Sequence, residues 1–309
     1  MTHDLTDAQH PMSIQAVDLG EYLKERKAVV DAALERYLPP MSEPPGLVHE
    51  AMRYSTLDGG KRVRPILTLA ACEAVGGRIE TALPAACAIE CIHSFSLIHD
   101  DLPCMDDDEY RRGRPTAHRV FGEAMALLAA DALFALAFQL ISETPEAPKG
   151  VIIEVTRLLA SAAGTRGMVG GQVMDMLAQA RDIDLAQIEQ IHRLKTGALI
   201  ETSVVAGGLL GGGLEEQIAA LSAYGRNVGL AFQIADDILD LPGDAAKLGK
   251  ATGSDLRLEK ATYPSVIGME RSGELARRAM SDAIEAISTL DHRAEPLRLI
   301  ARFIVEREA

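Results

Sequence analysis

Apolar residues recur at helical spacing along most of the chain. The first clear stretch runs from Val17 to Leu38 and ends at the proline-rich segment PPMSEPP. Further stretches with the same spacing follow at 62–76, 81–101, 119–142, 150–163, 185–206, 214–241, 273–291 and 294–306. No stretch alternates apolar and polar residues convincingly enough to indicate a sheet. The pattern therefore predicts helix nearly throughout.

Composition agrees with this pattern. Ala and Leu dominate, aromatic residues make up 4% of the chain, and β-branched runs are few. Breaks between the helical stretches fall at VGGR, ETPEAPKG and PGDAAKLGKATG, and no low-complexity linker separates two halves. We therefore expect residues 1–309 to form one all-α domain, with roughly the first 12 residues disordered.

The longest apolar segment, Ala124 to Ile141, is almost long enough to span a bilayer. It contains Asp131 and Gln139, and a charged group inside a membrane is costly. A helix buried at the centre of a large helical protein fits the segment better. The N-terminus has neither the basic start nor the apolar run of a signal peptide. We therefore expect no membrane span.

Net charge and cysteine usage narrow the class of protein. The net charge of −14 argues against a nucleic-acid backbone as the main partner. The four cysteines show no paired C-x-x-C spacing, which indicates reduced and mostly buried thiols in a cytoplasmic protein. The glycines of AGGLLGGGL, 206–214, indicate a loop or a close helix crossing, because they lack the dinucleotide spacing G-x-G-x-x-G.

A first acidic cluster lies in HDDLPCMDDDEYRRGRP, 99–115, after an apolar helix on which His93, Ser96 and Asp100 form one stripe. Asp106 lies six residues beyond Asp100, so an uninterrupted helix would turn it away. Pro103 prevents that regularity, because proline has no backbone N–H to give to a helix. A bulge there would return Asp106 to Asp100. No glycine stands where a calcium-binding EF-hand loop needs one.

A second acidic cluster lies in FQIADDILD, 232–240. On a helix Asp236 and Asp240 share a face with Gln233, and Asp237 follows directly among apolar neighbours. Carboxylates in such surroundings need cations or hydrogen bonds, although a solvated helix face remains the alternative. Two separate carboxylate sets favour Mg²⁺, which binds a few carboxylates and leaves other positions for water and phosphate oxygens.

Basic residues recur beside both acidic clusters. Each alone is more often a solvated surface charge, but together they indicate a phosphate-bearing ligand. They are Lys61, Arg62 and Arg64 in DGGKRVRP, then Arg111 and Arg112, then Lys195 in HRLKTGALI, and finally Lys250 and Lys260. GDAAKLGKAT is not a P-loop, because its glycines are one residue too far apart and Ala251 replaces the hydroxyl residue.

At this point the chain resembles the trans-type short-chain polyprenyl diphosphate synthases, the bacterial farnesyl and geranylgeranyl diphosphate synthase family. The resemblance runs from about residue 47 to the end. It rests on GGKRVRP, SLIHDDLPCMDDDEYRRGRPT, GMVGGQVMD, HRLKTGALI, GLAFQIADDILD and EKATYP, which occur in the family's order. It implies an isoprenoid synthase-type bundle of many helices around a deep central cavity, usually as a homodimer.

The resemblance also implies roles for individual residues. About three Mg²⁺ ions would be held between two walls, by Asp100, Asp101 and Asp106 on one and by Asp236, Asp237 and Asp240 on the other. The allylic diphosphate would bind Arg111, Lys195, Lys250 and Lys260. Isopentenyl diphosphate would bind Lys61, Arg64, His93 and Arg112. The residues beside the developing carbocation would be Lys195, Thr196 and Gln233. One departure is GSD, 253–255, where the family often has GKD.

The reaction implied is condensation of isopentenyl diphosphate with dimethylallyl or geranyl diphosphate by ionisation, condensation and elimination. In the family, an aromatic residue five positions before the first aspartate acts as a cavity floor. Phe95 therefore favours the C15 product, farnesyl diphosphate, although helical geometry puts Ser96 more squarely below Asp100. The alternatives are the C20 product, a class I terpene cyclase and a non-catalytic subunit. A cyclase would not need GGKRVRP, and both aspartate motifs are intact.

Overall fold

The computed structural model describes residues 17–57, 59–179, 183–240 and 262–306. Within these ranges the prediction of an all-α fold is confirmed, because the only strands are the two-residue β1 (Tyr110–Arg111) and β2 (Arg114–Pro115). The N-terminal disorder, Lys250, Lys260 and the departure at 253–255 are predictions that lie outside the described residues. The helices are α1 (Leu19–Tyr37), α2 (Gly46–Leu57), α3 (Val63–Ala74), α4 (Ile79–Asp100), α5 (Ala117–Phe121), α6 (Glu123–Ser142), α7 (Lys149–Ala163), α8 (Met168–Ala178), α9 (Leu185–His192), the π-helical η1 (Arg193–Gly197), α10 (Ala198–Leu210), α11 (Glu215–Leu239), α14 (Tyr263–Ile267), α15 (Met269–Ala286), the 3₁₀ turn η2 (His292–Ala294) and α16 (Glu295–Glu306).

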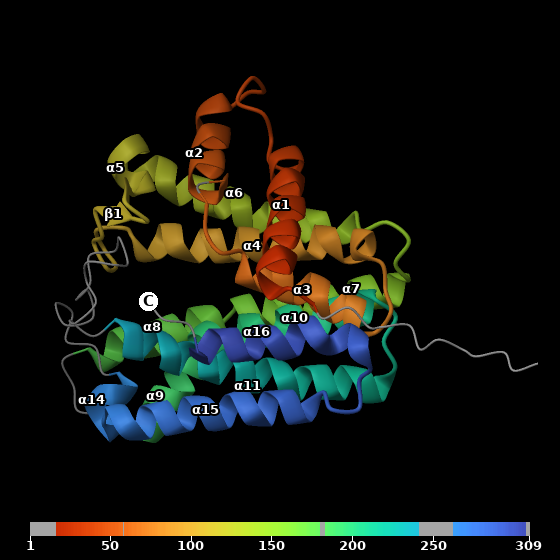
Figure 1. Ribbon diagram of the computed structural model, residues 1–309. Helices are drawn as coiled ribbons and strands as arrows, with labels where there is room; N and C mark the ends of the chain where they lie inside the picture. The colour runs from red at the N-terminus through yellow and green to blue at the C-terminus, as the bar shows by residue number, and fades with distance from the viewer. Residues whose placement is uncertain (1–16, 58, 180–182, 241–261, 307–309) are drawn as a thin grey trace, which may run out of the picture.

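Helix α4 lies at the centre of the bundle and contacts α3, α6 and α10. In Figure 1, α4 and α6 lie in the upper half, with α8, α11, α15 and α16 below them. One buried apolar cluster surrounds α4 and α6, and a second joins α3, α11 and α16. The site described below lies between these halves, where α4 faces α8 and the η1–α10 segment.

The glycines of AGGLLGGGL form a close helix crossing. Gly207 lies inside α10, and a Cβ added to it would meet the carbonyl oxygen of Thr68 at 2.0 Å. A Cβ on Gly211 would meet the carbonyl oxygen of Cys72 at 2.8 Å. Glycine is therefore required where α10 rests on the backbone of α3. The loop alternative was wrong for most of the segment, because α10 extends to Leu210.

Helix α6 is only partly enclosed, so its predicted position at the centre of the protein was wrong in part. Leu133 and Ala130 are fully buried, whereas Leu127 and Leu128 on another face are 44% and 53% exposed. In the described part of the chain, α4 and α6 are long and apolar enough to cross a membrane, with 78% and 39% of their apolar windows buried. Two such helices do not establish a membrane span.

The sequence pattern missed three of the described helices. It did not predict α2, which begins directly after a proline-rich segment, α8, whose GMVGG start reads as a break, or the short α14. The predicted helix 185–206 is interrupted by the π-helical turn η1. The cysteine prediction is confirmed for Cys72, Cys87 and Cys91, which are buried thiols, whereas the fourth, Cys104, is exposed.

Candidate active site

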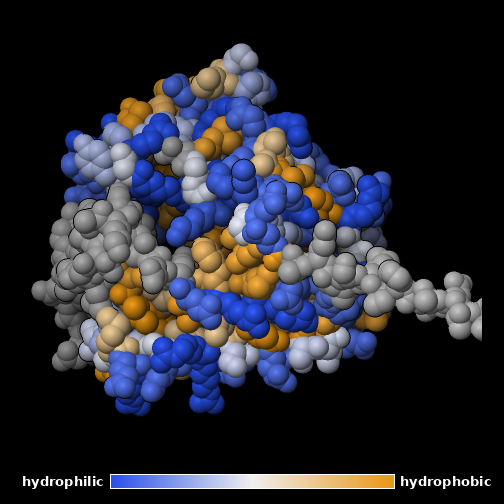
Figure 2. Space-filling model, in the orientation of Figure 1, coloured by the Kyte–Doolittle hydropathy of each residue, from blue (hydrophilic) through white to orange (hydrophobic). Residues whose placement is uncertain are grey.

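A cavity of about 360 Å³ opens between α4, α8 and the η1–α10 segment. Figure 2 shows a hollow between the upper and lower halves of the molecule, bordered by both hydrophilic and hydrophobic residues. Its polar lining includes many residues that the sequence had singled out, namely Arg64, His93, Ser96, Asp100, Lys195 and Thr196. Its apolar lining includes Phe95, Leu97, Met105, Val169, Val173 and Leu199. The cavity thus combines a charged end with a long apolar wall.

The first acidic cluster folds back on itself as the proline predicted. Helix α4 ends at Asp100, and a tight turn follows in which the Met105 N–H donates to the carbonyl of Leu102 at 2.8 Å. The Asp106 N–H then donates to the carbonyl of Asp100 at 2.9 Å. The bulge that returns Asp106 to Asp100 is therefore confirmed, and the two carboxylates leave the backbone at neighbouring points.

Asp101 points elsewhere. It is only 5% exposed, and its Oδ1 accepts hydrogen bonds from Arg111 Nε at 2.7 Å and Arg111 Nη2 at 2.5 Å. A buried, doubly hydrogen-bonded ion pair of this kind fixes both side chains. Asp101 thus positions Arg111, and its role as a metal ligand stays a prediction.

The arginines that follow form a tight hairpin. Arg112 and Gly113 have φ of 52° and 77°, the positive pair that a two-residue loop between β1 and β2 requires. The turn sends the Arg112 guanidinium against Gly60, where an added Cβ would meet its carbon at 2.9 Å. The loop that holds Gly60 and Lys61 and the β1–β2 hairpin are far apart in sequence, and this contact brings their basic residues together.

Arg62 has a structural role, unlike its neighbours Lys61, which is exposed, and Arg64, which lines the cavity. Its guanidinium donates to Glu90 at 2.7 Å, to Asp31 at 2.8 Å and to the carbonyl of Thr56 at 2.7 Å. Arg62 itself has a left-handed backbone, φ 51°. The network therefore holds the loop in the conformation that presents Lys61 and Arg64.

Replacing Arg62 with leucine is expected to lower the free energy of unfolding by about 3–5 kcal/mol, because the buried Glu90 carboxylate loses its partner. Urea denaturation measures the loss. The double variant Arg62→Leu/Glu90→Leu is the matched control and should recover part of it. A single variant within about 1 kcal/mol of the parent would contradict the assignment.

The wall opposite α4 is built by a glycine contact. A Cβ on Gly171 of α8 would lie 2.3 Å from the backbone nitrogen of Lys195, so only glycine lets α8 approach η1 this closely. Asp175, one turn further along α8, then receives a hydrogen bond from Lys195 Nζ at 2.6 Å. Burial would lower the pKa of Lys195, but Asp175 and Asp100 outweigh it and raise the pKa. Lys195 therefore stays charged beside the cavity.

A chain of hydrogen bonds connects this wall to the second acidic cluster. Thr196 Oγ1 donates to Gln233 Oε1 at 2.8 Å, and Gln233 Nε2 donates to Asp237 Oδ1 at 2.9 Å. Asp237 is buried, and its Oδ2 accepts the backbone N–H of Tyr263 at 2.9 Å. Both oxygens of Asp237 thus accept hydrogen bonds from the protein, and its role as a metal ligand stays a prediction. Asp240 caps α11 one turn beyond Asp236.

Nearby charges and burial shift the pKa values of two residues that line the cavity, Arg64 and His93. Burial lowers the pKa of Arg64, which lines the cavity, while the charges of Glu90 and Asp236 oppose that shift. Burial and the neighbouring arginines, Arg64 foremost, hold the pKa of His93 well below its usual value. His93 therefore faces the cavity as a neutral imidazole, able to donate one hydrogen bond and to accept another.

Phe95 and Ser96 both line the cavity, in different ways. The Phe95 ring, 9% exposed, packs against His99 at 4.5 Å and Phe134 of α6 at 5.1 Å between ring centroids. The Ser96 hydroxyl donates to the carbonyl of His93 at 2.8 Å. Phe95 is thus supported from behind by a second helix, as a floor would need to be.

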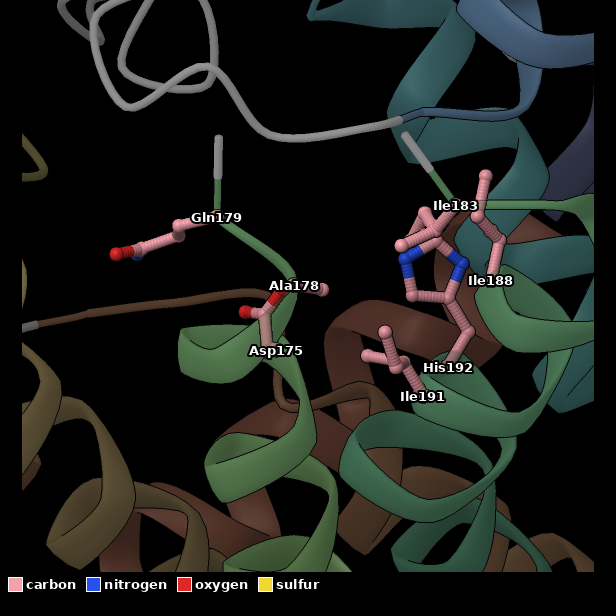
Figure 3. A pocket seen from close by; sticks show the side chains of 7 residues that line it. All are labelled: Asp175, Ala178, Gln179, Ile183, Ile188, Ile191 and His192. Carbon is pink, nitrogen blue, oxygen red and sulfur yellow. The ribbon is translucent and has the colours of Figure 1, made fainter. Parts of the chain in front are cut away.

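A smaller pocket lies behind Asp175, shown in Figure 3, where the His192 imidazole sits among Ile183, Ile188 and Ile191. Burial lowers the pKa of His192 from 6.5 to about 4. As the pH falls, His192 therefore becomes protonated near pH 6.5 in the unfolded chain but only near pH 4 in the folded chain. This difference destabilises the fold as the pH falls.

We expect the stability lost between pH 6.5 and pH 4 to be smaller in His192→Gln than in the parent, by up to roughly 3 kcal/mol. Urea denaturation at a series of pH values measures both chains, and their difference removes the contribution of the other titrating groups. Parallel curves for the two chains would contradict a neutral buried His192.

Hard oxygen donors suit Mg²⁺, and the described residues offer them in small sets. No group of three or more His, Cys, Asp or Glu side chains in the described ranges converges on one point. Mg²⁺ in proteins typically binds one or two carboxylates and fills its other positions with water and phosphate oxygens. Asp100 with Asp106, and Asp236 with Asp240, fit this role by their chemistry.

Comparison with known proteins decides the family. Residues 45–296 match the family described as Polyprenyl synthetase. The chain belongs to this family. The protein is accordingly a prenyltransferase of isoprenoid synthesis. The isoprenoid synthase-type fold is confirmed by the solved structures below.

Several relatives are similar over nearly their whole length. Geranylgeranyl diphosphate synthase of Cyanophora paradoxa is 47% identical over 94% of this chain and 97% of its own. Dimethylallyltranstransferase of Fischerella ambigua is 44% identical, over 98% and 88%. Among solved structures, an apo FPP/GFPP synthase from Zymomonas mobilis is 40% identical, with TM-score 0.83 over 93% and 98% of the two chains. Geranylgeranyl pyrophosphate synthetase from Pyrococcus horikoshii is 36% identical, with TM-score 0.85 over 94% and 98%.

Sequence reasoning missed three residues that shape the site. Asp175 holds Lys195, and Glu90 with Asp31 holds Arg62. Asp175 lies in the quoted motif GMVGGQVMD, so its place in the motif was a signal. Glu90 offered a weaker one, because it is a lone acid in the apolar run AACAIECI. Such an acid needs a buried partner.

Proposed function

We propose that this prenyltransferase is a Mg²⁺-dependent prenyl diphosphate synthase that adds isopentenyl diphosphate to allylic diphosphates. The observation that carries the proposal is the cavity lined by Asp100 of the first acidic cluster together with the basic residues Arg64 and Lys195. Burial lowers the pKa of Arg64, and the charge of Asp236, in the second acidic cluster, opposes that shift and so acts on a residue of the same lining. Two diphosphates need basic side chains to bind their oxygens, and the metal ions that accompany them need carboxylates nearby. The apolar wall below it suits a growing hydrocarbon chain.

The chain's own residues bind and orient the substrates. Asp100 and Asp106 on one wall, and Asp236 and Asp240 on the other, would hold Mg²⁺, which makes the allylic diphosphate a better leaving group. Lys195 and Arg111 would hold that diphosphate. Lys61, Arg64, His93 and Arg112 would hold isopentenyl diphosphate, with Arg64 and His93 already facing the cavity.

The carbon–carbon bond forms when the double bond of isopentenyl diphosphate attacks the allylic carbon as its bond to diphosphate breaks. A proton then leaves the new chain, and the departing diphosphate is the base proposed to take it. Thr196 and Gln233 offer oxygen dipoles near the allylic carbon, which stabilise positive charge without reorganisation. The apolar lining excludes water, which would otherwise quench the cation.

We propose the C20 product, geranylgeranyl diphosphate, in place of the C15 product expected from Phe95. Relatives named geranylgeranyl synthases at 47–48% identity support C20, from Cyanophora paradoxa and Arabidopsis thaliana. Phe95 lies in the cavity wall beside His99, and Val169, Val173 and Met176 of α8 add further apolar lining. The lining of about 360 Å³ of space is thus apolar on α8 as well as on α4, which suits a long hydrocarbon chain.

A cytoplasmic homodimer with about three Mg²⁺ ions per site remains part of the proposal. The exposed apolar residues of α6, Leu127 and Leu128, support self-association, because a second copy would remove them from water. A sedimentation experiment on the purified protein tests it.

Diphosphate release tests the function under three conditions: the allylic diphosphate alone, isopentenyl diphosphate alone, and the two together. The protein with Mg²⁺ should release diphosphate only when dimethylallyl and isopentenyl diphosphate are both present, and the extracted product should chromatograph as C20. Release from an allylic diphosphate alone, with a cyclic hydrocarbon product, would instead support a terpene cyclase. No release under any condition would support a non-catalytic subunit and contradict the proposal.

A further inference from the structure

The hydrogen-bond chain from Thr196 to Tyr263 has only one consistent polarity. A carboxylate only accepts hydrogen bonds, so Asp237 requires a donor from each neighbour. The Tyr263 backbone N–H is one, at 2.9 Å from Oδ2, and it cannot act otherwise. Another neighbour is the Gln233 side-chain amide, which must turn its NH₂ group toward Oδ1, at 2.9 Å. Asp237 thereby fixes which end of the Gln233 amide faces Thr196.

The consequence reaches the cavity. With its NH₂ group committed to Asp237, Gln233 presents its oxygen to Thr196, at 2.8 Å from Oγ1. The hydroxyl of Thr196 has a single proton, and it is used in this bond. Thr196 also lines the cavity, and toward any group there its hydroxyl oxygen can only accept a hydrogen bond. It presents lone pairs, never its proton, to whatever occupies the cavity.

We infer that Asp237 is a positioning residue that orients Gln233 and Thr196 so that oxygen lone pairs face the developing carbocation. This inference rests on the proposed function, because it assumes that positive charge develops beside Thr196. A hydroxyl that pointed its proton into the cavity would oppose that charge, whereas fixed lone pairs stabilise it. Asp237 contacts neither substrate in this assignment, and the metal is left to Asp236 and Asp240.

The variant Asp237→Asn is expected to reverse the direction of the hydrogen bonds from Asp237 to Thr196, with little change in side-chain shape. The Tyr263 N–H still requires an acceptor, so the new amide turns its oxygen to Tyr263 and its NH₂ to Gln233. Gln233 must then turn over, offer its own NH₂ to Thr196, and send the hydroxyl proton into the cavity. We expect kcat to fall about 10- to 100-fold, with unchanged KM for both diphosphates and an unchanged Mg²⁺ concentration at half-maximal rate.

A double-mutant cycle with Thr196→Val separates this effect from a structural one. Without the hydroxyl there is no proton to redirect, so Asp237→Asn in the Thr196→Val background should cost at most about twofold more. Thr196→Ser is the matched control: because it keeps a hydroxyl, Asp237→Asn should cost as much in the Thr196→Ser background as it does in the parent. Independent effects of the two changes would mean that Asp237 only anchors the start of α14. A raised Mg²⁺ requirement would mean that it binds metal. Either outcome overturns the inference.

If Asp237→Asn does not fold, as judged by circular dichroism, Gln233→Leu takes its place in the double-mutant cycle. Gln233→Leu removes the hydrogen bond between Gln233 and Thr196 itself. Effects of Gln233→Leu and Thr196→Val that are independent of each other would again overturn the inference. The parent enzyme is assayed alongside. An inactive parent would refute the proposed function, whereas an active parent with independent variants refutes only the role of Asp237.

Discussion

Replacing Asp100 or Asp236 with alanine is expected to reduce turnover by about 10³-fold or more while the protein stays folded, because several kcal/mol of charge stabilisation are lost. Both residues are half-buried, each at or near a helix end, and neither belongs to the apolar core. Their removal therefore leaves no cavity of consequence. Steady-state kinetics with saturating Mg²⁺, with circular dichroism as the fold control, measures the effect.

The loop offers a matched control for Asp100. Asp107 is an exposed acid in the same turn with φ 53°, a backbone that asparagine also tolerates. Asp107→Asn should keep nearly full activity. If Asp100→Ala or Asp236→Ala retained near-parent activity in Mg²⁺, the assignment of the two metal-binding walls would be wrong.

The second large effect concerns product length. Phe95→Ala is expected to lengthen the product by about one isoprene unit, since the change removes six ring carbons from the cavity wall and a unit adds five. The ring lies between the cavity and Phe134, so its removal opens space toward α6. Chromatography of the extracted products measures the shift.

The same truncation away from the cavity serves as the control. Phe121 packs against Tyr54, at 5.3 Å between ring centroids, and does not line the cavity. Phe121→Ala should leave the product distribution unchanged. An unchanged distribution for Phe95→Ala as well would show that Phe95 is a packing residue and that the floor lies elsewhere.

Features with a local cause were predictable from the sequence. Pro103 ends α4 because a proline cannot donate inside a helix, and the return of Asp106 to Asp100 follows within a few residues. The glycines of α10 also announced a close crossing. By contrast, the GMVGG start of α8 looked like a break, because the helix there depends on its fit against η1 rather than on propensity.

Features with a distant partner were not predictable in the same way. Arg62 resembles its basic neighbours in sequence, and only the fold shows that its guanidinium donates hydrogen bonds to Glu90 and Asp31. Asp101 and Asp237 stand in aspartate motifs, yet their partners come from a hairpin and from the start of α14. A motif gives the residue types of a site, whereas the long-range hydrogen bonds that each member makes are visible only in the folded chain.

The most direct test of the proposed reaction counts how many isopentenyl units enter the product. The protein, Mg²⁺, unlabelled dimethylallyl diphosphate and carbon-13-labelled isopentenyl diphosphate are incubated together, and the product is examined by mass spectrometry. The proposal predicts one unlabelled unit joined to three labelled units, the composition of a C20 chain. Two labelled units would restore the C15 assignment and leave the enzyme class intact. A product that carries no labelled unit would contradict prenyl chain elongation.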